Sequence, residues 1–402
     1  MVKSLRLASA ALLVWACAAR PVQAFVRYYP VYGADLMMGQ YFFNGTPSAW
    51  SGNMDLRAVP AVKFNESFMV IPTFQASYQG TKDVAELAGG AQLFQDSTKL
   101  AANVRPIVQW GNLRIKPEAG YRVDYLRETS DEKWGKGLFD YRKASAGTEL
   151  EYIFNERQWL SVGVDAFSLR FPNYVSLESE QPTLGRENAG SRTLDSNNSS
   201  FSAAWNTDTP FPNVRMSVGA SYLFRNYPDQ PLVDSAGQLE AELRKDTART
   251  FSGTLGWAQA LGAVDAGVFF EASETLVRSA QNHYDASAPV FLPNYYSYDE
   301  YALRPSIEFS FKKKGSFSLS YLWGLRSYSQ RPTQDSNGAY LPGTVDIHSR
   351  TLALALSIPL AAGFKATAQA NLTTSDSNMK FEKLYRYNYN LSSQMIGVSY
   401  EY

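Results

Sequence analysis

Charged side chains recur at every second position in several segments of this chain, and this spacing is the clearest sign of chemistry in it. Residues 113–125 read LRIKPEAGYRVDY, where basic and acidic residues alternate with apolar ones. A strand places alternate side chains on opposite faces, so one face of this segment is charged and the other is apolar. Unpaired charge is very costly in a packed core. We therefore expect the charged face to line water.

The same alternation returns in segments such as 54–64, 100–110, 214–225 and 364–372. The charged positions are the candidate pore-lining residues: Arg57, Lys63, Arg105, Arg114, Lys116, Glu118, Arg122, Asp124, Arg215, Arg225, Glu271, Glu300, Arg304, Glu308 and Lys365. The earlier strands supply mostly basic groups, and those near 263–310 supply mostly acidic ones. One hypothesis is a transverse field across a lumen; the alternative is that each charge is paired locally or simply hydrated.

Catalytic and metal-binding patterns are weak. Hydrolytic sites usually need a histidine beside a serine or an aspartate, and the two histidines, His283 and His348, lie in or next to long polar stretches. We expect no catalytic residue and no enzymatic activity. Metal-site spacings are absent, so we expect no metal and no cofactor. A weak calcium site in the polar run 195–200 is the alternative.

The first 24 residues resemble a leader rather than part of a domain. A basic start (Lys3, Arg6), a short apolar stretch and the small-residue ending Val22-Gln23-Ala24 predict a cleaved secretory signal peptide. A lipoprotein signal that uses Cys17 is the alternative. Residues 25–402 would then form one domain without cysteine. The leader holds three of the 38 basic residues and no acid, so the remainder is slightly acidic and nucleic acid is not an expected partner.

After residue 25 no segment has 18 continuous apolar residues, so no membrane helix is expected. The alternating segments are joined by short turns, such as 111–112 and 261–262, and by longer polar stretches, such as 80–97, 171–198, 228–245 and 330–346. We count about 16 strands, the first near 32–43 and the last near 388–402. This layout predicts a closed antiparallel outer-membrane barrel. A soluble sandwich is the alternative, but its strands would be shorter.

Lipid offers no hydrogen-bond partners, so a spanning sheet must close on itself. Sixteen strands leave an aqueous lumen. Aromatic residues near the strand ends are expected to form interfacial girdles: Phe64, Trp110, Phe154, Trp159, Phe224, Trp257, Phe311 and Trp323. Five prolines inside expected strands remove ladder donors and suggest bulges near the short-turn rim: Pro60, Pro72, Pro106, Pro117 and Pro305.

The end of the chain carries a resemblance. Ile396, Val398, Tyr400 and Tyr402 alternate up to the last residue. This pattern resembles the C-terminal signature of porin-like β-barrels in the outer membrane of Gram-negative bacteria, although Phe is commoner at the position of Tyr402. The resemblance implies an all-β outer-membrane barrel whose partners are outer-membrane lipids and the barrel insertion machinery. It identifies no subfamily.

These observations predict a pore for hydrophilic solutes across the outer membrane. The alternative is an export pore for a secreted polymer such as an exopolysaccharide, which would need a separate periplasmic partner. A constriction would require a loop folded inward, and the longest candidate is 171–198.

Overall fold

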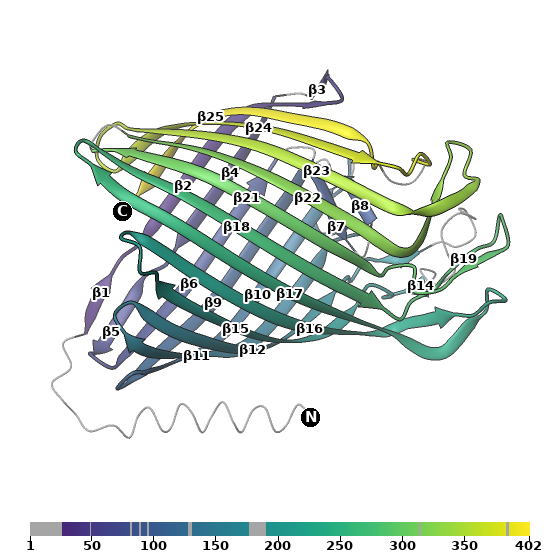
Figure 1. Ribbon diagram of the computed structural model, residues 1–402, viewed down its shortest axis with the longest axis horizontal. Helices are drawn as coiled ribbons and strands as arrows, with labels where there is room; N and C mark the ends of the chain where they lie inside the picture. Colours follow the sequence, from purple (N-terminus) through teal and green to yellow (C-terminus); the bar gives the residue numbers. More distant parts are fainter. Residues whose placement is uncertain are drawn as a thin grey trace.

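The computed structural model describes residues 26–402, except 49, 81–82, 88–89, 95, 128–130, 177–189, 313–314 and 383–385. The predicted signal peptide lies outside the described residues, as does the middle part, residues 177–189, of the candidate constriction loop. In the described part of the chain, no helix is long and apolar enough to cross a membrane. The described chain forms one closed antiparallel barrel of 16 strands (Figure 1).

The barrel strands follow one another around the sheet in sequence order. They are β2 (Tyr32–Phe43), β4 (Ser51–Ala58) with its continuation β5 (Ala61–Asn65), β6 (Phe68–Gln79), β9 (Asp96–Trp110), β10 (Leu113–Arg127), β11 (Tyr141–Asn155), β12 (Gln158–Arg170), β15 (Ser196–Asp208), β16 (Val214–Val233), β17 (Leu239–Leu261), β18 (Val264–Ser279), β21 (Tyr298–Phe311), β22 (Gly315–Gln334), β23 (Tyr340–Pro359), β24 (Phe364–Ser377) and β25 (Tyr389–Glu401).

The first and last strands close the barrel. β2 pairs with β4 on one side and with β25 on the other, from Gly33 opposite Glu401 to Phe43 opposite Leu391. Two short strands are added to barrel strands: β1 (Arg27–Tyr29) pairs with β5, and β3 (Thr46–Pro47) pairs with β2. Three small hairpins lie outside the barrel sheet: β7–β8 (Asp83–Leu87, Gly90–Phe94), β13–β14 (Val175–Ser176, Gly190–Ser191) and β19–β20 (His283–Asp285, Val290–Leu292).

Two of the expected long loops largely continue the strands of the barrel. Residues 228–245 and 330–346 continue the pairs β16–β17 and β22–β23, which project beyond the rest of the barrel at the end opposite the C-terminus (Figure 1). Register shifts at Pro231 and at Pro332 let each pair carry on past its proline. The sequence pattern missed these extensions because outside the membrane neither face needs to be apolar.

The five prolines inside the expected membrane strands leave the register unchanged. Between β9 and β10, pairing stops after Ile115 opposite Val108 and resumes at Ala119 opposite Val104. Pro106 and Pro117 lie in that gap, and the register is the same on both sides. Pro60 falls in the break between β4 and β5. At these positions the sheet therefore tolerates missing donors without the bulges that we expected.

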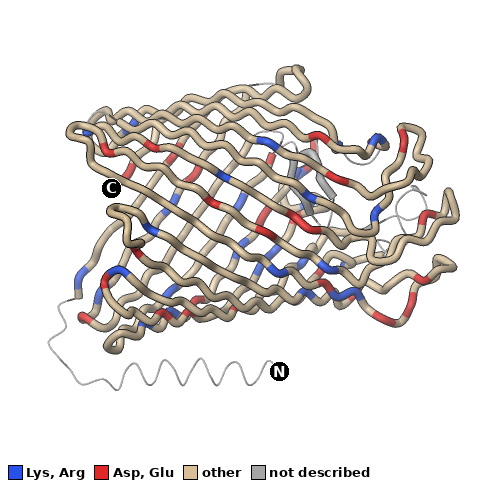
Figure 2. Tube along the Cα trace, viewed as in Figure 1, with Lys and Arg blue, Asp and Glu red and all other residues tan. Residues whose placement is uncertain are grey.

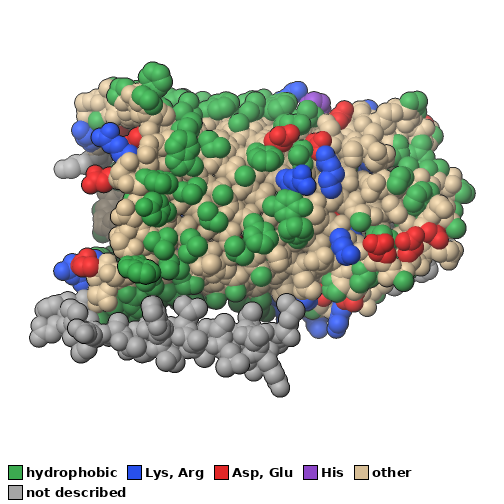
Figure 3. Space-filling view, turned by 60° about the horizontal axis from the view of Figure 1, so that its bottom comes forward, with side chains coloured by type: hydrophobic (Ala, Val, Ile, Leu, Met, Phe, Trp, Pro, Cys, Tyr) green, Lys and Arg blue, Asp and Glu red, His purple; other side chains and the backbone are tan. Residues whose placement is uncertain are grey.

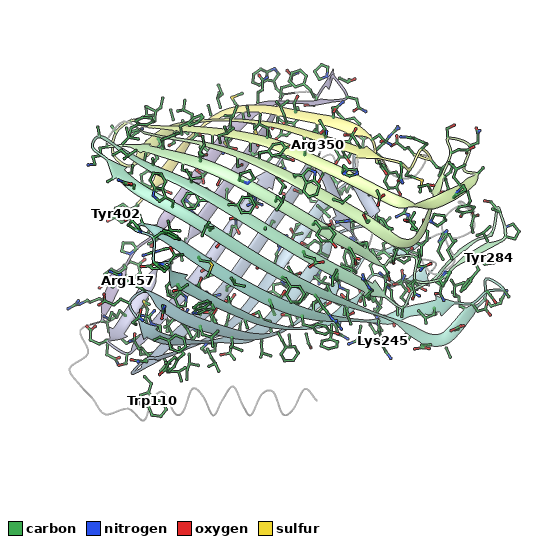
Figure 4. The ribbon with its side chains drawn as sticks, in the orientation of Figure 1. Trp110, Arg157, Lys245, Tyr284, Arg350 and Tyr402 are labelled. Atoms are coloured by element: carbon green, nitrogen blue, oxygen red, sulfur yellow. The ribbon has the colours of Figure 1, made fainter. Side chains whose placement is uncertain are left out.

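The outward face of the sheet is apolar. Leu36, Leu100, Phe251 and Ile396 are each about half exposed or more, and Figure 3 shows hydrophobic side chains over much of the visible wall, with charged side chains in the half nearer the loops and at the opposite rim. Monomeric soluble proteins rarely expose apolar patches of this extent. Trp110, 79% exposed, projects away from the barrel (Figure 4). Trp159 is a correction to the expected girdles: it shares its face with Ser161, because it is in register with the inward side of β12.

Candidate functional site: the inner wall

The charged residues expected to line a pore lie on the face opposite the exposed apolar side chains. Figure 2 shows basic and acidic positions interspersed along the strands over the length of the barrel. On β10 and β11 the register places Arg114 opposite Glu151 and Lys116 opposite Glu149. The Lys116 ammonium lies 2.7 Å from a carboxylate oxygen of Glu149 and 2.7 Å from one of Glu151. Arg114 Nη1 lies 2.9 Å from the other oxygen of Glu151.

The same wall continues on β9 and further up β10. Arg105 forms an ion pair with Glu118 on the neighbouring strand. Arg122 donates to a carboxylate oxygen of Asp124 at 2.6 Å and to the hydroxyl of Tyr141 at 2.6 Å. Each base is thus paired with an acid that points in the same direction.

Acidic and basic side chains are also paired on β18, β21 and β22, in another part of the sheet. Arg304 lies 3.3 Å from Glu271, its direct partner in register. Arg326 forms an ion pair with Glu300. Glu308 is exposed, and no ion pair joins it to another described residue.

The barrel seam carries a third group. Glu401 accepts from Arg57 at 2.8 Å and from Lys365 at 2.6 Å. This carboxylate therefore links β4, β24 and β25 beside the pair that closes the sheet.

The remaining predicted positions are nearer the ends of the strands. Lys63 pairs with Glu66 in the turn after β5. Arg215 lies 3.0 Å from Asp208 across the β15–β16 turn. Arg225 donates to Asn198 at 3.2 Å and to Tyr227 at 3.3 Å.

Side chains on the inner wall are open to solvent. The side chains of Arg105, Arg304 and Glu271 are 47%, 51% and 49% exposed, although they belong to the face turned away from lipid. Exposed ion pairs of this kind add little stability. The local pairing matches the alternative to a transverse field, because most of the charges are offset by a neighbour on the same wall.

Sequence reasoning missed the partners Glu149, Glu151, Arg326 and Glu401. Alternation alone marks Glu149 and Glu151 as lying on one face of β11. A long connection separates β10 from β11, so their register could not be deduced, and register decides which charges meet.

Two buried arginines at the loop end were also missed. Arg244 is paired with Asp246, Nη2 to Oδ2 at 2.6 Å, and their side chains are 4% and 7% exposed. Arg331 is 5% exposed and lies over the rings of Tyr295, Tyr328 and Tyr387 at 4.8–5.5 Å. These residues hold the long loops together at the mouth of the barrel.

The histidines lie apart from one another in the fold. His283 stacks on Tyr295 at the mouth, with ring centroids 4.4 Å apart. His348 is in register with Leu325 and Asp376, on the outward face. In the described residues, no group of three or more His, Cys, Asp or Glu could hold a metal ion.

Comparison with known proteins finds solved structures of similar shape but low sequence identity. No family model matches the chain, and no curated protein matches it. Solved structures with a similar arrangement include OmpT, an outer membrane protein of Vibrio cholerae, at 10% identity and a TM-score of 0.47, over 94% of this chain and 99% of that one. Pseudomonas aeruginosa OpdO has 10% identity and a TM-score of 0.44, over 94% and 97%. A "bacterial polysaccharide outer membrane secretin" has 13% identity and a TM-score of 0.43, over 93% and 98%.

This comparison corrects one prediction. We expected no enzymatic activity, but four OmpT structures are among those similar to this chain, so that exclusion does not stand. At 10% identity the comparison does not establish an activity either.

The sheet is closed, its outer face is largely apolar, and its inner face carries exposed charged side chains. It has the architecture of a β-barrel of the outer-membrane type. Its subfamily is not identified.

Proposed function

We propose that this barrel lets hydrophilic solutes cross the outer membrane through its lumen. The supporting observation is the exposure of paired charges on the inner wall, such as Arg304 with Glu271, each about half exposed. Water that reaches these groups provides a polar path beside them, and a pore needs such a path. We include in the pore lining the charged residues listed for β4, β5, β9, β10, β16, β18, β21 and β24.

The pairing supports weak selectivity for charge. Where each base is offset by an acid on the next strand, the wall presents alternating small fields rather than one sign. Hydroxyl pairs add neutral polar surface: Thr250 with Thr275 and Thr351 with Thr373, each with oxygens 3.0 Å apart. Uncharged polar solutes and small ions of both signs fit such a wall.

Planar-bilayer recording tests this function. Purified protein should give discrete, stable conductance steps that increase with KCl concentration, and liposomes containing it should swell in small sugars. Protein unfolded by heat before reconstitution is the control. If folded protein, shown to be inserted, conducts no ions and admits no sugars, the proposal fails. Loss of a secreted polymer on deletion of the gene, together with a silent bilayer, would instead support the export alternative.

A further inference from the structure

Two arginines face each other on the outward side of the sheet. In the β11–β12 ladder, Arg142 is directly opposite Arg170. The same face carries the pairs Ala146–Ala166, Leu150–Val162 and Tyr152–Leu160 below them, and Leu150, Tyr152 and Val162 are each more than 40% exposed. Both arginine side chains therefore belong to the lipid-facing side of the barrel wall.

The pair lies at the height of lipid headgroups. The strands end in a short turn just beyond Tyr152, and short turns lie on the periplasmic side. From the Tyr152–Leu160 pair to the arginine pair, a rise of about 3.4 Å per residue on strands tilted by about 40° gives roughly 25 Å, about the height of the outward apolar band. The arginines are therefore at its outer boundary.

The protein itself compensates this charge incompletely. Arg170 donates to the carbonyl oxygens of Leu169 and Ser196, both at 2.8 Å, and to Asn197 Oδ1 at 2.6 Å. Its nearest carboxylate, Asp195, is 3.8 Å away and also accepts from the backbone N–H of Phe171. The exposed side chain of Arg142 has no ion pair or hydrogen bond to any described residue.

Two other outward arginines near this rim have close carboxylate partners. Arg127 donates to Asp96 at 2.7 Å, and Arg278 lies 2.5 Å from Asp299. Like charges directly opposite one another destabilise a strand pair. Arg127 and Arg278 each have a close carboxylate, whereas Arg170 has only the more distant Asp195 and Arg142 has no carboxylate partner among the described residues.

We propose that Arg142 and Arg170 together bind the phosphate group of an anionic lipid in the outer leaflet. The planar fork of each guanidinium matches phosphate oxygens, and one phosphate between the two would relieve their repulsion. A lipid fits better than free phosphate, because its acyl chains can lie along the apolar strip from Ala144 down to Tyr152 while the headgroup stays at the boundary.

Lipid binding tests this site. The protein in dodecyl maltoside micelles is titrated with dioleoyl phosphatidic acid, or with the phosphatidylcholine of the same chains, and bound lipid is counted by native mass spectrometry. The test variant is R142Q/R170Q. The matched control is R157Q/K312Q, which removes two charges from turns at the other end of the barrel; Figure 4 shows Arg157 at the end opposite the loops.

Wild type and control should bind phosphatidic acid at least about tenfold more tightly than the test variant, and phosphatidylcholine equally. Equal affinity of wild type and test variant for phosphatidic acid overturns the proposal. Inorganic phosphate that displaces the lipid at equal concentration overturns its lipid part, since the site would then be a free-anion site.

A single variant guards against a folding defect. R142Q removes a side chain without a described protein partner, so in lipid-free micelles it should melt at or above the wild-type temperature. Phosphatidic acid should then raise the melting temperature of wild type more than that of R142Q. An equal rise in both would contradict a role for Arg142.

Discussion

The ammonium of Lys116 lies 2.7 Å from a carboxylate oxygen of Glu151, and both side chains are largely shielded from water at 16% and 10% exposure. Glu149 shares the same lysine. One cation on the inner wall thus holds two carboxylates, and its removal would change the charge that a passing ion meets.

The first prediction concerns ion selectivity. K116Q should shift the reversal potential in a KCl gradient toward cations, by about a twofold change in permeability ratio, because Glu149 loses its partner and the wall gains net negative charge. The matched control is R249Q, which removes a cation from the outward face, where Arg249 lies over Tyr222. An equal shift in both variants would contradict the placement of Lys116 in the ion path.

The second prediction concerns the buried pair at the loop end. D246L leaves Arg244 buried without its carboxylate, so the free energy of opening the β16–β17 extension should fall by about 3–5 kcal/mol. Hydrogen exchange of the segment 228–245 measures it. R244M/D246L should recover most of the loss, because no charge is then left buried. A double variant as unstable as D246L would show that packing, not charge, dominates.

The third prediction concerns acid sensitivity of the mouth. Burial of Asp285 opposes its ionisation, but hydrogen bonds from the hydroxyls of Ser287 and Tyr340 and from backbone N–H groups outweigh it and lower its pKa. A lowered folded-state pKa stabilises the fold above the unfolded pKa of about 4, and this stabilisation is lost as pH falls through the folded value.

Protection of the β19–β20 hairpin should therefore persist at pH 4 and fall below it. Hydrogen exchange, corrected for its intrinsic pH dependence, gives the measurement. D285N should be less protected at neutral pH and insensitive to acid in this range. If D285N keeps the acid transition of the wild type, another group causes it.

The fourth prediction concerns the seam. A Cβ on Gly397 would lie 2.1 Å from the carbonyl oxygen of Leu36 on β2, so G397A should force the closing strands apart. Gly253, within β17, has its nearest such atom at 3.9 Å, and G253A is the matched control. The folded fraction, measured as resistance of the barrel to SDS without heating, should fall sharply for G397A alone. Normal folding of G397A would show that the seam relaxes easily.

The alternation of residue types was enough to predict the architecture. Segments such as 113–125 have one charged and one apolar face. This alternation of faces is a property of each strand and does not depend on which strands lie beside it. The expected first and last strands agree with β2 and β25, and the expected short turns at 111–112 and 261–262 join β9 to β10 and β17 to β18. Lipid requires a closed sheet, so the pattern predicted the barrel as well.

Which charges meet was decided only by the tertiary structure. Lys116 pairs with Glu149 and Glu151, and Lys365 with Glu401, because of registers that depend on long loops and on closure of the first strand against the last. The same holds for Arg142 opposite Arg170. Alternation assigns each side chain to one face of the sheet. Its partner on the next strand depends on the register between the two strands, and no local sequence pattern determines that register.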